Sequence, residues 1–138
     1  MTEANETAGN SQQQTVPETG VVLIEATVIS YLVTALNTNN VFAERPVNPP
    51  DEYYVIERTS GGEINHIQTA TIAVQSISGS SLLRAAQMNK AVVKAMPGVV
   101  QAMDVSCCRL NSAYNYTDTE TKQYRYQAVF DLYYMEGD

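Results

Sequence analysis

A strict alternation near the C-terminus, over residues 123–134, most constrains how this chain can fold. Apolar and aromatic residues occupy every second position, and more polar residues lie between them. A period of two is typical of a β-strand whose two faces meet different surroundings. The first set is Tyr124, Tyr126, Ala128, Phe130, Leu132 and Tyr134, and the second is Arg125, Gln127, Val129, Asp131 and Tyr133. The fold must therefore contain a sheet with one core face.

Four earlier segments also read as strands. The run Val41–Glu44 is short and is closed by prolines, which cannot donate to a ladder. The runs Tyr53–Thr59, Ile67–Ile77 and Val105–Leu110 are rich in aromatic and β-branched residues. A turn or longer hairpin loop is expected at Ser60–Asn65, and a polar loop at 111–122.

Two segments have helical spacing. From Val21 to about Asn37, apolar residues recur at intervals of three and four. A second helix follows the cap signal Gly79-Ser80-Ser81 and ends at Pro97-Gly98. One of its faces carries Leu82, Ala85, Asn89, Val92 or Val93, and Met96. The order αβββαββ predicts an α+β two-layer sandwich, with a mostly antiparallel sheet of about five strands and two helices on one face.

The chain of 138 residues predicts one domain, spanning residues 21–138. Residues 1–20 contain acidic but no basic side chains and few apolar ones, so we expect a flexible acidic tail there. No apolar run reaches the roughly 20 residues of a membrane span, and the first residues do not resemble a secretory signal. We therefore expect a soluble protein with no membrane partner.

Charge and cysteine content narrow the function classes. Eight basic residues against 15 acidic ones give a net charge of -7, which argues against a surface that binds the DNA backbone. The only two cysteines, Cys107 and Cys108, are adjacent, and neighbouring side chains on a strand project to opposite faces. They are poorly placed for a disulfide, which indicates a reducing compartment.

No group of residues forms a catalytic pattern. The one histidine, His66, has no carboxylate or cysteine at metal-ligand spacing. A pair of His66 with either cysteine lacks the helix N-terminus that stabilises a thiolate. Gly61-Gly62 lacks the spacing and the lysine of a phosphate cradle. We expect no catalytic residue, no metal and no cofactor, and a small cytosolic hydrolase stays the distant alternative.

The aromatic composition bears on possible interfaces, because the chain has nine tyrosines and only two phenylalanines. Tyr114 and Tyr116 fall in the expected polar loop, and Tyr133-Tyr134 places one ring on each face of the last strand. Tyrosine is enriched in protein interfaces because its rigid ring carries a hydroxyl that still finds a partner. A sheet with tyrosines on the face opposite the helices is thus a candidate assembly surface.

Five short motifs resemble the small tail terminator, or tail completion, proteins of long-tailed bacteriophages. They are VFAERP (41–46), ERTSGG (57–62), IAVQSISGS (72–80), NSAYNYTD (111–118) and RYQAVFDL (125–132). The resemblance spans roughly residues 24–134. The acidic N-terminal tail is a departure from the compact form of that family.

The resemblance implies a non-enzymatic structural protein of the virion neck, made in the host cytoplasm. Such proteins form a hexameric ring that caps the last ring of tail-tube subunits, ends tail polymerisation and presents a docking surface for the DNA-filled head. The implied partners are the chain itself, the tail tube protein, and a head-completion or connector protein, with DNA only passing through the lumen. Another neck-ring protein, either a head-completion or a head–tail connector protein, is the close alternative.

Candidate residues follow from these expectations. The loop from Thr59 to His66 is expected to order on contact with an adjacent ring, and the strand 123–134 and the helix 80–96 are candidates for ring contacts. Acidic loop residues are candidates for lining the channel, because acidic walls repel phosphate. The interface candidates are Thr59, Gly61, Gly62, Glu63, Ile64, Tyr114, Tyr116, Arg125, Tyr133 and Tyr134, and the channel candidates are Glu63, Asp118 and Glu120.

Overall fold

The computed structural model describes residues 23–121 and 123–135, so the acidic tail expected at residues 1–20 lies outside the described residues. The helices are α1 (Ile24–Ala35), α2 (Leu82–Ala95) and α3 (Val99–Ala102), with a 3₁₀ turn at Met96–Gly98 between the last two. The strands are β1 (Val41–Phe42), β2 (Glu52–Ile64), β3 (Ile67–Ser78), β4 (Val105–Asn115) and β5 (Tyr124–Tyr134).

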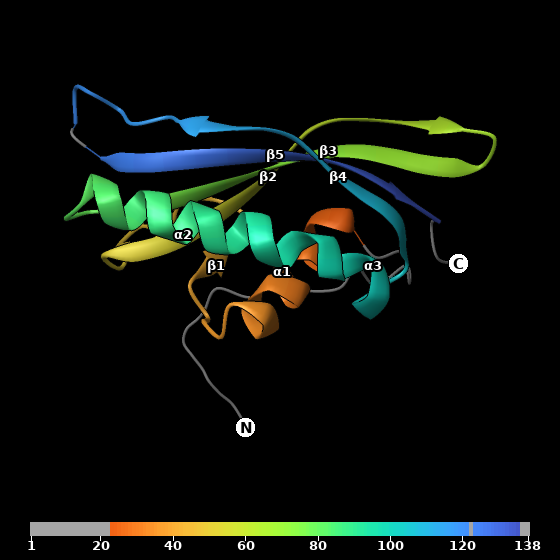
Figure 1. Ribbon diagram of the computed structural model, residues 1–138, viewed down its shortest axis with the longest axis horizontal. Helices are drawn as coiled ribbons and strands as arrows, with labels where there is room; N and C mark the ends of the chain where they lie inside the picture. The colour runs from red at the N-terminus through yellow and green to blue at the C-terminus, as the bar shows by residue number, and fades with distance from the viewer. Residues whose placement is uncertain (1–22, 122, 136–138) are drawn as a thin grey trace.

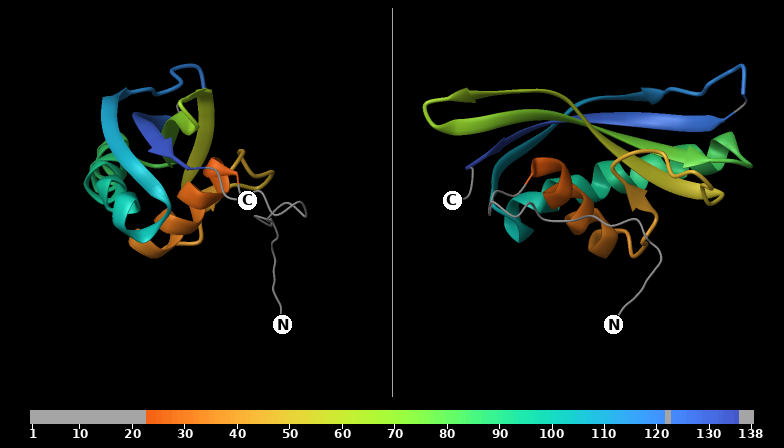
Figure 2. Two further views of the ribbon diagram at one scale, coloured as in Figure 1. Left: turned by 90° about the vertical axis from the view of Figure 1, so that its right-hand side faces the viewer. Right: turned by 180° about the vertical axis from the view of Figure 1, so that it is seen from behind.

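The five strands form one sheet in the order β1-β2-β3-β5-β4. Only the β1–β2 pair is parallel, and the other three pairs are antiparallel. The helices lie on one side of the sheet, which curves over them (Figures 1 and 2). The predicted α+β two-layer sandwich and the order αβββαββ are confirmed, with the short α3 as an addition.

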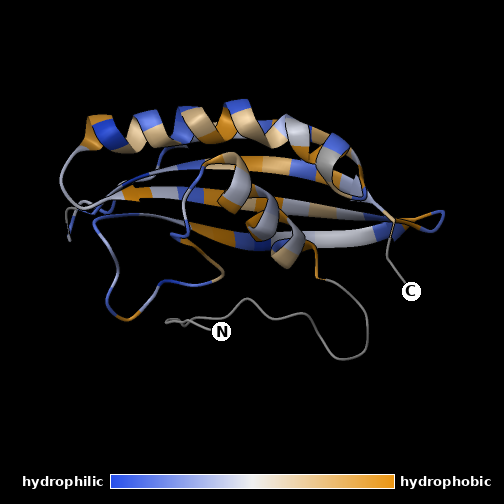
Figure 3. Cartoon of the chain, turned by 90° about the horizontal axis from the view of Figure 1, so that it is seen from below, coloured by the Kyte–Doolittle hydropathy of each residue, from blue (hydrophilic) through white to orange (hydrophobic). Residues whose placement is uncertain are grey.

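The core lies between α1, α2 and the inner face of the sheet. The alternation in β5 sets this face, because Ala128, Phe130 and Leu132 are fully or almost fully buried. The helices contribute residues at helical spacing, and Figure 3 shows hydrophobic and hydrophilic segments alternating along both. The buried helix residues are Ile24, Val28, Ile29 and Leu32 of α1 and Ala85, Met88, Asn89 and Val92 of α2. Leu82, expected on the core face, is 39% exposed.

The helices are joined by a close contact between Tyr31 and the segment that follows α2. The Tyr31 hydroxyl donates a hydrogen bond to the carbonyl oxygen of Ala95 at 2.7 Å. Gly98 lies against the same hydroxyl, so closely that a Cβ at this position would collide with it. Gly98 is therefore required by packing, although its φ of -68° suits any residue.

The expected hairpin loop at Ser60–Asn65 is wrong. β2 continues to Ile64, which pairs with Ile67, so the turn consists of Asn65 and His66 alone. Their φ angles are 51° and 69°, the left-handed values that a two-residue type I′ hairpin requires. The glycines at 61 and 62 lie inside the strand, where Gly is usually unfavourable. Composition therefore placed the turn several residues too early.

Two other expected boundaries are also wrong. β4 continues through residues expected to be loop and ends at Asn115, because Ser112, Ala113, Tyr114 and Asn115 are paired with β5. The second helix does end before Pro97-Gly98, at Ala95, although a 3₁₀ turn with Pro near its start then leads into the separate short α3. Proline fits there because the first turn of a helix leaves its N–H groups unbonded. The first strand is shorter than expected and ends at Phe42.

Candidate assembly surface

The sheet has an open face on the side away from the helices. Residues paired across neighbouring strands share a face, so the pairing assigns each side chain to a side. The views from three directions place both long helices on the other side (Figures 1 and 2). We call this side the open face, and Tyr53, Ala73, Ile77 and Gln127 are its buried members. Its residues are Tyr53, Val55, Glu57, Ser60, Gly62 and Ile64 of β2, Thr69, Thr71, Ala73, Gln75 and Ile77 of β3, Cys107, Arg109, Ser112 and Tyr114 of β4, and Arg125, Gln127, Val129, Asp131 and Tyr133 of β5.

A row of amides crosses the middle of the open face. The Nε2 of Gln75 donates to Oε1 of Gln127 at 3.1 Å, and the Nε2 of Gln127 donates to the Tyr114 hydroxyl at 2.6 Å. These bonds join β3, β5 and β4. Tyr114 was expected in a polar loop, but it belongs to β4, and its pairing with Gln127 places its side chain on the open face.

A second polar row is centred on Asp131. Its Oδ1 accepts a hydrogen bond from the Thr71 hydroxyl at 3.0 Å, and its Oδ2 accepts one from Nδ2 of Asn111 at 3.1 Å. Both carboxylate oxygens are thus bonded within the same sheet. The open face is ordered by its own side chains, which lowers the entropy that a docking partner would have to remove.

Aromatic side chains gather where β4 and β5 meet their connecting loop. The rings of Tyr114 and Tyr116 lie edge to face with centroids 5.9 Å apart. The guanidinium of Arg125 lies 4.8 Å from the centroid of the Tyr116 ring, and its Nε donates to the Tyr116 carbonyl oxygen at 2.8 Å. Tyr114 and Tyr116 are 41% and 45% exposed. This cluster brings together three of the interface residues predicted from the sequence.

The β2–β3 hairpin carries most of the other predicted interface residues. The side chain of Arg58 lies across Gly61 and donates to the carbonyl oxygens of Ser60 and Thr69, both at 3.3 Å. A Cβ at position 61 would displace the Arg58 guanidinium from this position. At the tip, Ile64 is 60% exposed, in agreement with the expectation that it is exposed.

The structure corrects the position of one predicted interface residue and places the three channel candidates. Tyr134 was expected on an interface, but it is 8% exposed and belongs to the core, because it faces the helices. The three channel candidates do not lie together within one subunit. Glu63 lies in the β2–β3 hairpin, whereas Asp118 and Glu120 lie in the β4–β5 connection, at the opposite end of the molecule (Figure 1).

The strand edges are features that the sequence analysis missed. β4 is the last strand of the sheet and pairs only with β5. β1 pairs with β2 at Tyr54 and Val55, and within residues 23–121 and 123–135 no strand lies against the β2 edge opposite β3 from Ile56 to Ile64. Neither free edge contains lysine or proline, the residues that commonly block strand addition.

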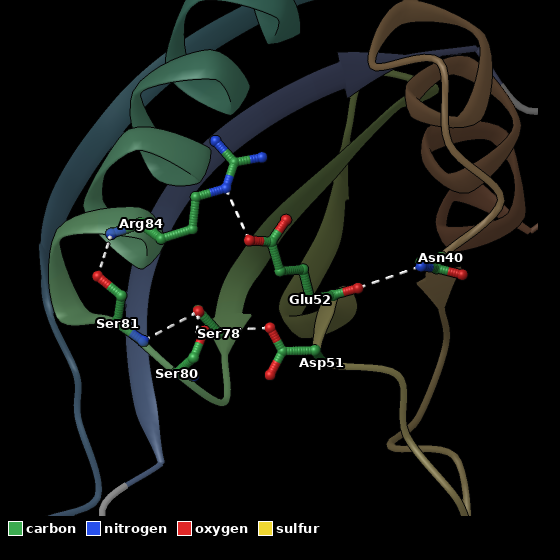
Figure 4. Close-up of polar contacts among 7 residues, drawn as sticks. All are labelled: Asn40, Asp51, Glu52, Ser78, Ser80, Ser81 and Arg84. Atoms are coloured by element: carbon green, nitrogen blue, oxygen red, sulfur yellow. Dashed lines mark hydrogen bonds and ion pairs between the residues drawn. The ribbon is translucent and has the colours of Figure 1, made fainter.

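A separate polar cluster fixes the start of α2 against the end of the sheet (Figure 4). Ser81 caps the helix by accepting from the backbone N–H of Arg84 at 3.1 Å, and the Nε of Arg84 donates to the Glu52 carboxylate at 2.8 Å. The Ser80 hydroxyl donates to Asp51 at 3.1 Å. The cap holds the first turn of α2, the Arg84–Glu52 bond links α2 to β2, and the Ser80–Asp51 bond joins the turns that precede these two elements, so the cluster has a clear structural role.

The titratable groups are spread over the molecule. Burial raises the pKa of Cys108 to about 11, and the Glu52 carboxylate raises the pKa of Arg84 through their hydrogen bond. The side chain of His66 is 94% exposed at the hairpin tip, with Nδ1 3.8 Å from Glu63. Within residues 23–121 and 123–135, no three His, Cys, Asp or Glu side chains could hold a metal ion together. No helix in the same ranges is long and apolar enough to cross a membrane.

Comparison with known proteins gives no relative for this chain. No protein-family model matches it, and no characterised protein matches it significantly.

Proposed function

We propose that this chain is a subunit of a homohexameric ring in the neck of a long-tailed bacteriophage, where it caps the tail tube as a tail terminator. The proposal rests on the sequence motifs and on the open face. One structural observation supports it most: helices cover only one side of the sheet, while the other side presents ordered polar and tyrosine side chains. Such a surface suits repeated docking of rigid subunits.

The cluster of Tyr114, Tyr116 and Arg125 is the proposed docking centre of the open face. Tyrosine and arginine are over-represented among residues that dominate binding energy. Both tyrosine rings are held by contacts within the subunit, so they lose little freedom on binding. The exposed Ile64 at the other end supplies an apolar contact for an adjacent ring of the neck.

A nonsense mutation in the phage gene tests the function. We expect tails of abnormal length and separate DNA-filled heads, with both defects corrected by the wild-type chain supplied in trans. Tails of normal length beside unjoined heads would identify a head-completion or connector protein instead. Normal tails joined to heads would refute a neck function altogether.

Two variants locate the contacts. Tyr116→Ala in trans should restore neither tail length nor joining, and Ile64→Asp should abolish joining while the purified protein keeps its melting temperature, because both side chains are exposed. Val47→Asp is the matched control for Ile64→Asp, since Val47 is 95% exposed in a loop. A particle reconstruction with one or 12 copies per neck would rule out the hexamer.

A further inference from the structure

Among the residues that the structure describes, two strand edges of the same sheet have no partner strand. One is β4 along its length, and the other is β2 beyond the two residues that β1 covers. Long exposed edges present rows of free N–H and C=O groups and pair readily with other chains. We propose that the β4 edge of one subunit pairs with the β2 edge of a second copy of this chain, so that the sheets join head to tail. This inference deepens the proposed ring and rests on it.

Strand direction favours this pairing. β4 runs antiparallel to β5, β5 to β3, and β3 to β2. β4 and β2 of one subunit therefore run in opposite directions. Rotation about an axis along the strands keeps these directions, so β4 would meet the next subunit's β2 in the antiparallel sense. A symmetric β4–β4 contact would satisfy one edge and leave the β2 edge exposed, whereas a closed ring satisfies both.

The irregularities of the two edges also match. β4 has an unpaired residue between Leu110 and Ser112, and β2 has one between Arg58 and Ser60. When Cys107–Ser112 is laid antiparallel against Glu57–Gly62, the two irregularities fall at neighbouring positions, because the unpaired residue of each strand lies one place from that of the other. On both sides of the irregularities, residues on the open face of one chain are then paired with residues on the open face of the next chain. The pairs on the open face are Cys107 with Gly62, Arg109 with Ser60, and Ser112 with Glu57.

The charged residues and a glycine on the two edges also favour this register. Arg109 is the only charged residue of β4, and in this register it lies diagonally across from Glu57 of the next subunit. Long side chains reach such diagonal partners. Within the described residues neither Arg109 nor Glu57 takes part in an ion pair. Gly62, which has only Thr69 Oγ1 near its missing Cβ, marks a place where another backbone can approach closely.

Disulfide trapping tests the pairing. Directly opposite residues of an antiparallel pair have Cα atoms about 4.5–5.5 Å apart, within the range that a disulfide spans. The test chain carries Ser112→Cys and Glu57→Cys with Cys107→Ala and Cys108→Ala. The control carries Ala113→Cys in place of Ser112→Cys, which moves one thiol to the helix side of the sheet. Both chains are oxidised as free protein and in tails.

We expect a ladder of covalent multimers up to the hexamer for the test chain, about tenfold more than for the control. A dimer alone, or no multimer in either sample, would overturn the edge pairing. If the ring forms and caps tails without a ladder, only this inference fails. If the ladder forms but the nonsense mutant has normal, joined tails, the edge pairing stands and the proposed function fails.

Discussion

The contact between Tyr31 and Gly98 allows a double-mutant cycle in which the sign of the coupling energy between the two substitutions can be predicted. Tyr31→Phe removes the hydrogen bond to Ala95 and should lower the free energy of unfolding by about 1 kcal/mol. Gly98→Ala adds a Cβ that collides with the hydroxyl, so the ring must move and the bond is lost. We expect this variant to lose about 1–2 kcal/mol, in the range of other overpacking changes.

The double variant should be more stable than the sum of the two changes. Without the hydroxyl, the added Cβ meets only the ring carbon Cζ, at 3.5 Å, an ordinary contact. The alanine then contributes about 0.4–1 kcal/mol by restricting the unfolded chain, because the φ at Gly98 suits it. The double variant should therefore lose less than about 1 kcal/mol, against about 2–3 for the sum.

Urea unfolding of the full chain, followed by circular dichroism, measures all four proteins. Gly62→Ala is the matched control, since its Cβ would lie 3.5 Å from the nearest atom, Thr69 Oγ1. Its effect should add to that of Tyr31→Phe. A Tyr31–Gly98 cycle that is additive within about 0.5 kcal/mol would refute the steric argument.

Three further predictions concern the turn, the thiols and a loop carboxylate. His66→Gly should raise the free energy of unfolding by about 1 kcal/mol, because a left-handed residue with a side chain is strained; a urea midpoint no higher than wild type contradicts this. At pH 8 a thiol reagent should label Cys107 well before Cys108, whose pKa of about 11 leaves on the order of 0.1% thiolate; equal rates would oppose it. Hydrogen bonds from the backbone of Glu120 and from Thr121 lower the pKa of Asp118, so the charge that holds this turn is present above pH 3.8 and is lost as pH falls through the lowered pKa. Amide shifts of Glu120 should report that midpoint, and a midpoint above 3.8 would contradict it.

The fold class could be predicted because apolar residues recur at a regular interval in each element that forms the core. The alternation of β5 and the spacing of Ile24, Val28 and Leu32 in α1 both reflect burial on one side, which the structure confirms. Tyr114, Tyr116 and Arg125 were separate interface candidates, and the contact that brings their side chains together was not predicted.

The errors arose where local composition opposed long-range pairing. Ser60, Gly61 and Gly62 have weak strand propensity, but pairing with β3 holds them in β2. The true turn uses Asn65, a residue that tolerates the left-handed region, followed by a histidine that does so less readily. The free edges could not be predicted, because they depend on the order of strands rather than on any residue pattern.

The central strand β3 has a consequence for how the sheet aligns during folding. Ile72 and Val74 are buried under the helices, and Ala73 and Ile77 are buried on the other face, so hydrophobicity alone does not distinguish its two sides. A slip of β3 by one residue exchanges its faces. That slip would move Thr71 and Gln75 beneath the helices, away from their partners on β5, and burying them unpaired costs several kcal/mol. Thr71 and Gln75 therefore specify the register of β3 against β5. A chain with Thr71→Val and Gln75→Leu would populate two competing strand registers.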